Sequence, residues 1–224
     1  MQDILEQYGS LMREVDSWFA SCLHQYPEKI SCQQGCSACC RGLFDITLLD
    51  AVYLKYGFDK LPGDLKSFIL RKSEARLNAV SRVYPNFVQP WLLNSIPETD
   101  WDLIMPEDDE IPCVLLSESG QCQVYKYRPM TCRLNGIPMI DTSGEELFDE
   151  WCSLNFINVD PLLMEGLRFN FNELFAQELL LFRELSKRLI DRPINEIDTV
   201  IPAALSVNLE SVVNQLKQHE LQVN

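Results

Sequence analysis

The chain has 224 residues, 46% hydrophobic and 23% charged, so it is long enough and apolar enough to bury a core. Its formal charge of −14 at pH 7 argues against nucleic acid as a partner, since neutralising phosphates requires a basic face. The N-terminus lacks the pattern of a signal peptide, and no apolar run approaches the roughly 18 residues of a membrane span. We therefore expect a cytoplasmic protein without membrane contact.

Apolar side chains recur at helical spacing through residues 1–26, which predicts a long amphipathic helix. The stretch from 32 to 42 has no period and is expected to be a loop. Thr47 is the expected N-cap of a short helix over residues 48–56 that stops at Gly57.

Pro62 is expected to open a second long helix that runs to about residue 84. Between residues 85 and 120, five prolines and scattered acids remove the helical period, so this stretch is predicted to be irregular. Short apolar runs then flank a turn at Gly144, which predicts a β-hairpin over residues 136–151.

Asn172 is the expected N-cap of a helix over residues 173–190, and two shorter helices over about 193–206 and 208–220 follow it. The predicted fold class is therefore mainly α with a small β-hairpin. We expect a single domain over residues 1–224.

Nine cysteines are unusual in a chain of this composition. Because thiols stay reduced in the cytoplasm, a dense cysteine pattern there favours metal or redox chemistry over a disulfide scaffold. Cys22 lies on the apolar face of the first predicted helix and is expected to be an ordinary core residue. The other eight are the candidate metal ligands: Cys32, Cys36, Cys39, Cys40, Cys113, Cys122, Cys132 and Cys152.

The short gaps in the first cysteine group suit a metal, which draws two thiolates to within about 3.5–4 Å of each other. Gly35 and Gly42 would let the backbone fold tightly and point N–H groups at the sulfurs of residues such as Cys36. The adjacent residues Cys39 and Cys40 do not easily bind one ion together. They would serve two neighbouring ions, different irons of one cluster, or one metal and one spare position.

Basic residues are scarce in this chain, yet several lie close in sequence to the cysteines: Arg41, Lys126, Arg128 and Arg133. Their charges would offset several thiolates and lower the pKa of each thiol. The alternative is that they are ordinary surface residues. Arg128 precedes Pro129, which holds it extended and favours a structural role or a role in supporting the ligands.

The runs CQQGCSACC and IPCVLLSESGQCQVYKYRPMTCR resemble the bacterial family of zinc- or iron-chelating domains named for its CxxCxxCC run, also called YkgJ-like. The resemblance covers roughly residues 30–155 and includes all eight candidate ligands, with Cys152 matched more loosely. The first gap is three residues rather than the family's two. The resemblance implies a metal-chelating core between an N-terminal helix and a C-terminal helical segment.

Other chemistry is poorly supported by the sequence. His24 and His219 both lie outside the cysteine motifs, which favours an all-sulfur ligand set and weakens hydrolytic mechanisms. The acidic run over residues 106–110 is expected to be a solvated loop rather than a calcium site. No nucleotide-binding loop or hydrolase motif occurs, so we assign no catalytic residue.

Two classes of function remain open at this point. The first is a binding protein in which eight thiolates chelate zinc or iron, with closed sites that leave no position for catalysis. The alternative is an oxidoreductase or redox protein that depends on an iron–sulfur cluster. Thiolates select both metals, so ligand type does not decide between them. The acidic surface also leaves open a basic protein partner of unknown identity.

Overall fold

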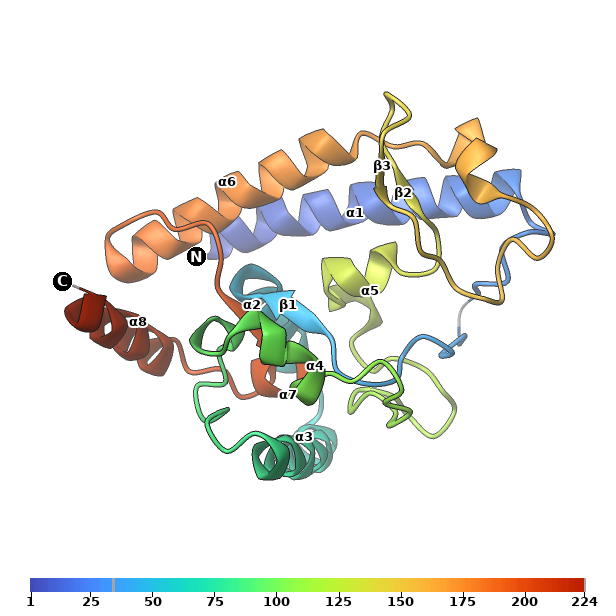
Figure 1. Ribbon diagram of the computed structural model, residues 1–224. Coiled ribbons are helices and arrows are strands. Elements are labelled where there is room, and N and C mark those ends of the chain that lie inside the picture. Colours follow the sequence, from blue (N-terminus) through green and yellow to red (C-terminus); the bar gives the residue numbers. More distant parts are fainter. Residues whose placement is uncertain (34, 224) are drawn as a thin grey trace.

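The computed structural model describes residues 1–33 and 35–223, with side chains described as far as residue 217, so His219 lies beyond the described side chains. The chain is mainly α-helical, as predicted (Figure 1). Among the described helices, none combines the length and the apolar character needed to cross a membrane. The α-helices are α1 (Gln2–Gln25), α2 (Leu48–Phe58), α3 (Gly63–Val83), α4 (Trp101–Ile104), α5 (Met130–Leu134), α6 (Phe171–Ile190), α7 (Ile201–Ala204) and α8 (Leu209–Val223). The strands are β1 (Asp45–Thr47), β2 (Met139–Ile140), β3 (Glu146–Phe148) and β4 (Asp198–Val200). The 3-10 turns are η1 (Leu93–Ser95), η2 (Glu98–Asp100), η3 (Tyr125–Tyr127), η4 (Pro161–Leu163) and η5 (Glu165–Leu167).

Helices α1 and α6 lie side by side and antiparallel along one edge of the molecule (Figure 1). The inner face of α1 is apolar because buried residues recur three or four positions apart, as at Tyr8, Met12 and Val15. The Trp18 ring joins the two helices, because it packs edge-on against Phe171 with the ring centroids 5.1 Å apart. The predicted N-terminal helix is therefore confirmed.

Helix α2 begins as predicted, because the Thr47 hydroxyl accepts a hydrogen bond from the backbone N–H of Asp50. Its predicted end at Gly57 is wrong, since the helix continues to Phe58. A Cβ at position 57 would lie 2.2 Å from the Cγ of Tyr127. The glycine therefore serves close packing against the Tyr127 ring rather than termination of the helix.

Replacing Gly57 with Ala is expected to lower the free energy of unfolding by about 2 kcal/mol, because the Tyr127 ring or the helix must move to admit the new methyl group. Gly63→Ala at the start of α3 is the matched control. A Cβ there would meet nothing within 4 Å, so this substitution should change the free energy of unfolding by less than about 0.5 kcal/mol. Urea unfolding of both variants makes the measurement, and equal effects would contradict the packing explanation.

Strand β1 pairs antiparallel with β4 and so joins the start of α2 to the C-terminal part of the chain. The helix predicted over residues 193–206 is wrong, because this stretch holds the buried strand β4 and only the four-residue helix α7. The Thr199 hydroxyl donates to the carbonyl of Trp91 at 2.8 Å, and the β-branched side chains of Thr199 and Val200 favour an extended backbone. The long helix opened by Pro62 and the last predicted helix are confirmed as α3 and α8.

The hairpin predicted around Gly144 is confirmed, since β2 pairs antiparallel with β3 and Gly144 has a φ of +89°. The N-cap of α6 lies two residues before the predicted one. Asn170, rather than Asn172, accepts a hydrogen bond through its Oδ1 from the backbone N–H of Glu173. Asn172 instead donates its backbone N–H to the Asp141 carboxylate, which ties α6 to the hairpin.

The stretch between residues 85 and 120 has more structure than its prolines predict. It contains α4, η1 and η2, and it closes around a second apolar cluster in which Phe87 and Leu93 are completely buried. Apolar packing against α3 therefore explains why this stretch is ordered, and no metal is needed to explain it.

Candidate metal centre

Most of the candidate cysteines line one cavity of about 120 Å³. They come from three separate parts of the chain: Cys36, Cys39 and Cys40 from the loop before β1, Cys113 and Cys122 from the loop before η3, and Cys132 from α5. The fold therefore brings together cysteine groups that lie far apart in the sequence.

Backbone pairing places the first cysteine group beside the second. Arg41 forms an antiparallel bridge with Pro112, and the Cys113 N–H donates to the Cys40 carbonyl at 2.9 Å. The N–H of Gly42 extends this contact by donating to the carbonyl of residue 111. Because these bonds fix the backbone, the Cys40 and Cys113 positions are neighbours before any metal binds.

Cys113 and Cys122 stand on the two arms of a tight turn. The Ser117 N–H donates to the Gln121 carbonyl at 2.9 Å, and Gly120 turns the chain with a φ of +76°. A left-handed backbone of this kind favours glycine. Turns of this type bring two thiols toward one point, as thiolate metal sites require.

The thiols around this cavity are hard to deprotonate without a cation. Burial raises the pKa of Cys113 to about 11, and burial also raises the pKa of Cys122. For Cys132 burial raises the pKa well above its usual range, and the charges of the other two thiols add to the effect. Backbone N–H groups of Leu115 and Val124 act in the opposite direction on Cys113 and Cys122. A bound cation would displace these protons.

Cys32 and Cys152 lie together beside Gly136. A Cβ at this glycine, whose φ is +104°, would lie 3.3 Å from the Cys32 sulfur and 3.8 Å from the Cys152 Cβ. The Asn155 side chain organises the same place, because its Nδ2 donates to the Gly136 carbonyl at 2.6 Å and to the Cys32 sulfur at 3.3 Å. Its Oδ1 accepts from the Ser31 N–H.

The remaining thiols connect these two places. Burial raises the pKa of Cys32, and the charges of Cys152, Cys36 and Cys39 raise it further, so all four thiols are close enough to interact. The pKa of Cys39 is raised chiefly by a hydrogen bond with the Cys40 thiol. The adjacent residues Cys39 and Cys40 therefore lie between the thiols of the small cavity and the thiols beside Gly136.

Arg128 is the basic residue most closely associated with the thiols. Its charge acts against the other contributions that raise the pKa of Cys39, Cys122 and Cys132. Its guanidinium lies 4.0 Å from the centroid of the Tyr125 ring, and its buried Nε has no hydrogen-bond partner within the described structure. This arrangement fits a positive charge that stabilises neighbouring thiolates.

Arg133 has a structural position. Its side chain is only 2% exposed, pairs with Asp16 on α1, and donates to the backbone carbonyls of Arg128 and Lys126. It thereby holds the segment between Cys122 and α5 in place. By contrast, the side chains of Arg41 and Lys126 are exposed, which is typical of ordinary surface residues.

The thiols gather without closing around a point. Among the side chains that the structure describes, those of residues 1–33 and 35–217, no three of Cys, His, Asp or Glu stand close enough together to hold an ion. Cys36 is exposed, whereas the other candidate thiols are at least partly buried. The chemistry of the donors fits zinc or iron, because both bind thiolates.

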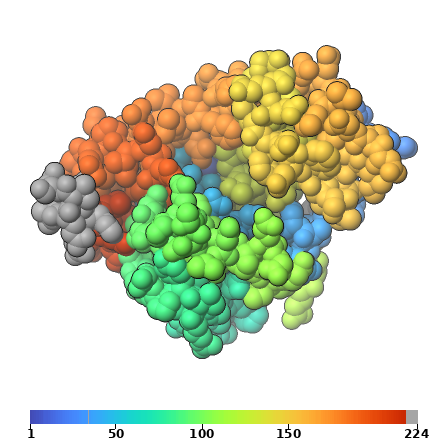
Figure 2. Space-filling view, in the orientation of Figure 1, coloured from blue at the N-terminus to red at the C-terminus, as the bar shows by residue number. Residues whose placement is uncertain are grey.

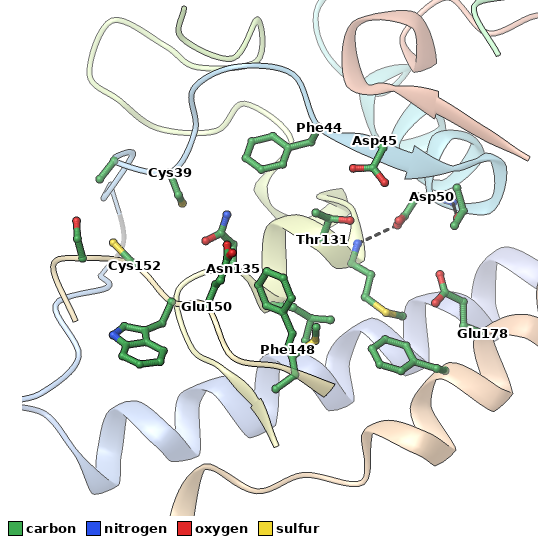
Figure 3. Close-up of a pocket in the computed structure, with 18 of the residues that line it drawn as sticks. Cys39, Phe44, Asp45, Asp50, Thr131, Asn135, Phe148, Glu150, Cys152 and Glu178 are labelled. Atoms are coloured by element: carbon green, nitrogen blue, oxygen red, sulfur yellow. Dashed lines mark hydrogen bonds between the residues drawn. The ribbon is translucent and has the colours of Figure 1, made fainter. Parts of the chain in front are cut away.

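A larger cavity of about 740 Å³ adjoins the cysteines. Figure 2 shows this face of the molecule hollowed between the β2–β3 hairpin and the segment that carries α4. In Figure 3, Cys39 and Cys152 lie at one end of the cavity, and Asp45, Asp50 and Glu178 lie at the other. Cys39 lines both cavities, so the larger one opens toward the thiols.

The acidic end of this cavity predicts a pH-dependent stability. Burial raises the pKa of Glu178 from 4.5 to about 8, and the charges of Asp50 on α2 and Asp198 on β4 add to the rise, while the Tyr8 hydroxyl opposes it. A raised pKa means that the folded state holds the proton more tightly than the unfolded state. The stability contribution is therefore complete below pH 4.5, falls as the pH rises, and is lost above about pH 8.

Glu178→Gln removes this titration, so the variant should be more stable than the parent at pH 9 by at least about 1 kcal/mol, the order of one pKa unit. At pH 4 the two proteins should be alike. Urea unfolding at both pH values makes the measurement, with the exposed Glu173→Gln on the same helix as control. A Glu178→Gln effect that does not change with pH would contradict the raised pKa.

Sequence reasoning did not single out Gly136, Asn155 or the acidic end of the larger cavity. Gly136 and Asn155 each follow a candidate cysteine by a few residues, and that proximity is the only signal they carry. Glu178 carries none, because it lies on a different helix from every cysteine of the site.

Together these features define a cysteine-rich metal-chelating domain built on a helical scaffold. A family model named CxxCxxCC, described as "Putative zinc- or iron-chelating domain", matches residues 31–153. The match spans more than half of the chain, and the chain belongs to this family, as the cysteine motifs predicted. Neither curated proteins nor solved structures gave a match.

Proposed function

We propose that the protein binds zinc or iron through the thiolates of eight cysteines, which form two neighbouring sets. Membership of the chelating family supports metal binding in general. The observation that carries the ligand assignment is the convergence of three separate cysteine groups on adjoining cavities. Four thiolates for each ion would give about two tetrahedral sites.

The first set comprises Cys40, Cys113, Cys122 and Cys132. Its support is the backbone bond between Cys40 and Cys113, the shared turn of Cys113 and Cys122, and the charge effect of both on Cys132. Arg128 lies against this set and offsets part of its negative charge.

The second set comprises Cys32, Cys36, Cys39 and Cys152. Its support is the packing of Cys32 and Cys152 against Gly136 and the effect of the charges of Cys152, Cys36 and Cys39 on the pKa of Cys32. This division also gives each of the adjacent residues Cys39 and Cys40 its own ion, which relieves the strained geometry of sharing one.

Metal content of protein purified without oxygen tests the proposal. The parent should carry about two ions per chain by elemental analysis. Cys132→Ser and Cys32→Ser should each lose about one, and the doubly substituted protein should lose both. Cys22→Ser is the matched control, because Cys22 is buried on α1 against apolar neighbours and should keep the full content. Metal absent from the parent would overturn the proposal, and equal losses from every variant would overturn the division into sets.

An iron–sulfur redox protein is the second candidate, and the larger cavity is the observation that favours it. A cluster held near Cys39 and Cys152 would be reachable by a small molecule through that cavity. Brown protein with iron and acid-labile sulfide would support this candidate. A colourless protein that contains zinc would support closed thiolate sites instead.

A further inference from the structure

Among the carboxylates at the acidic end of the larger cavity, Asp50 feels the charge of Arg133, whereas no cation among the described residues acts on Glu178. The Tyr8 hydroxyl lies 2.7 Å from the Asp50 carboxylate and 3.4 Å from that of Glu178. A hydroxyl has one proton, and Tyr8 donates it to the nearer carboxylate, that of Asp50. Asp50 also accepts a hydrogen bond from the Met130 N–H at 2.9 Å. Glu178 is then left without a strong donor. Within the described part of the chain, no ion pair includes Asp45, Asp50 or Glu178.

Uncompensated carboxylates in a partly buried place are costly, because burial penalises the charged form. Burial accordingly raises the pKa of Asp50 as well as that of Glu178. A positive group placed against Glu178 would restore the charged form of this carboxylate. The end of the cavity that faces away from the cysteines is therefore suited to a cation.

The walls of the cavity select the kind of cation. Aromatic and aliphatic side chains line it between the acidic end and the thiols, and Figure 3 shows Phe44 and Phe148 between these two ends. The other apolar lining residues include Met130, Leu134, Met139 and Phe175. A hydrated metal ion would gain nothing from such walls, whereas a cation with an apolar body would bury that body against them.

We propose that this cavity binds a small organic cation of the alkylammonium class. Its ammonium group pairs with Glu178, whose carboxylate the Tyr8 hydroxyl separates from Asp50, and its apolar body runs past Phe44 and Phe148 toward Cys39 and Cys152. The volume of about 740 Å³ is that of a small-molecule site. Recognition of the cation rests on groups outside the cysteine sets, so it stands independently of which metal the thiolates hold.

Calorimetric titration of the full-length, metal-loaded protein tests the proposal with three probes of equal length: hexylammonium, hexanol and hexanoate. Hexylammonium should bind at least tenfold more tightly than hexanol, because it adds a charge-assisted contact to the same apolar burial. The titrations are made at pH 9, where Glu178 is ionised, and hexanoate should then bind more weakly than hexanol because the carboxylates repel it. Hexylammonium that binds no better than hexanol would overturn the proposal.

Glu178→Gln keeps the shape of the side chain and should weaken hexylammonium binding at least tenfold while leaving hexanol binding unchanged. Glu173→Gln makes the same charge change on an exposed position of α6 and should have no effect. An unchanged affinity in Glu178→Gln would show that this carboxylate does not hold the cation.

The methyl signals of Met130 and Met139 provide a measurement that needs no variant. Both residues line the cavity, so their carbon-13 signals should shift when hexylammonium binds to the labelled parent protein. Binding without these shifts would place the cation elsewhere. Displacement of hexylammonium by Mg²⁺ at constant ionic strength would identify an inorganic cation site and would also overturn the proposal.

Discussion

Removal of the metal with a chelator is expected to lower the free energy of unfolding by about 4 kcal/mol for each of the two proposed ions, measured against protein kept at a metal concentration 1,000-fold above the dissociation constant. The physical reason is that the thiols gather without closing around a point, and the raised pKa values of Cys113 and Cys132 show that burial disfavours their thiolate forms. On the proposed function, a bound metal would therefore add to the backbone bonds that already join the cysteine loops.

The metal-free protein should nevertheless keep its helices. The core between α1, α2 and α6 is built from residues such as Tyr8, Leu54 and Phe171, which are fully buried. The far-ultraviolet circular dichroism should change little, while proteolysis should become faster within residues 32–42 and 112–133. Thermal unfolding with and without chelator makes the main measurement. Identical midpoints, with metal loss verified, would contradict a structural contribution of the metal.

Arg133→Met is expected to lower the free energy of unfolding by about 2–4 kcal/mol and to weaken metal binding roughly 10- to 100-fold. The substitution keeps most of the apolar volume but leaves the carbonyls of Arg128 and Lys126 without their donor, and Asp16 without its buried partner. The segment between Cys122 and α5 then keeps the pair of Arg128 with Asp16 but loses the contacts of Arg133, so the thiols of the first set are less well placed.

Arg188→Met is the matched control, because Arg188 also pairs with a carboxylate of α1, Asp3, but on an exposed surface. Exposed pairs contribute little, so its effect should stay below about 1 kcal/mol and metal affinity should not change. Equilibrium unfolding and competitive metal titration compare the two variants. Arg133→Met with unchanged metal affinity would show that Arg133 stabilises the fold without positioning the cysteines.

These two results bear on each other. If metal removal and Arg133→Met both loosen the same segment, their effects on the free energy of unfolding should not be independent. Both changes made together should then lower it by less than the sum of their separate effects. A simple sum would indicate that Arg133 acts only through the helical core. The comparison therefore separates the stability of the scaffold from the organisation of the thiols.

The sequence by itself determined the long helices α1, α3 and α6, the hairpin at Gly144, and the family. Each of these depends on local order along the chain: the helical period of apolar residues, a turn residue between two short runs, and the spacing of cysteines. Such features are readable without knowing what lies opposite them in space.

The tertiary structure decided what depends on distant neighbours. It showed that Gly57 admits the Tyr127 ring, that β4 is a strand because β1 lies beside it, and that Asn155 supports Cys32. It also placed Glu178 in a cavity that ends at the thiols. These features could not be predicted from the sequence, because whether a residue is close-packed, paired or buried without a counter-ion is set by chain segments far away from it.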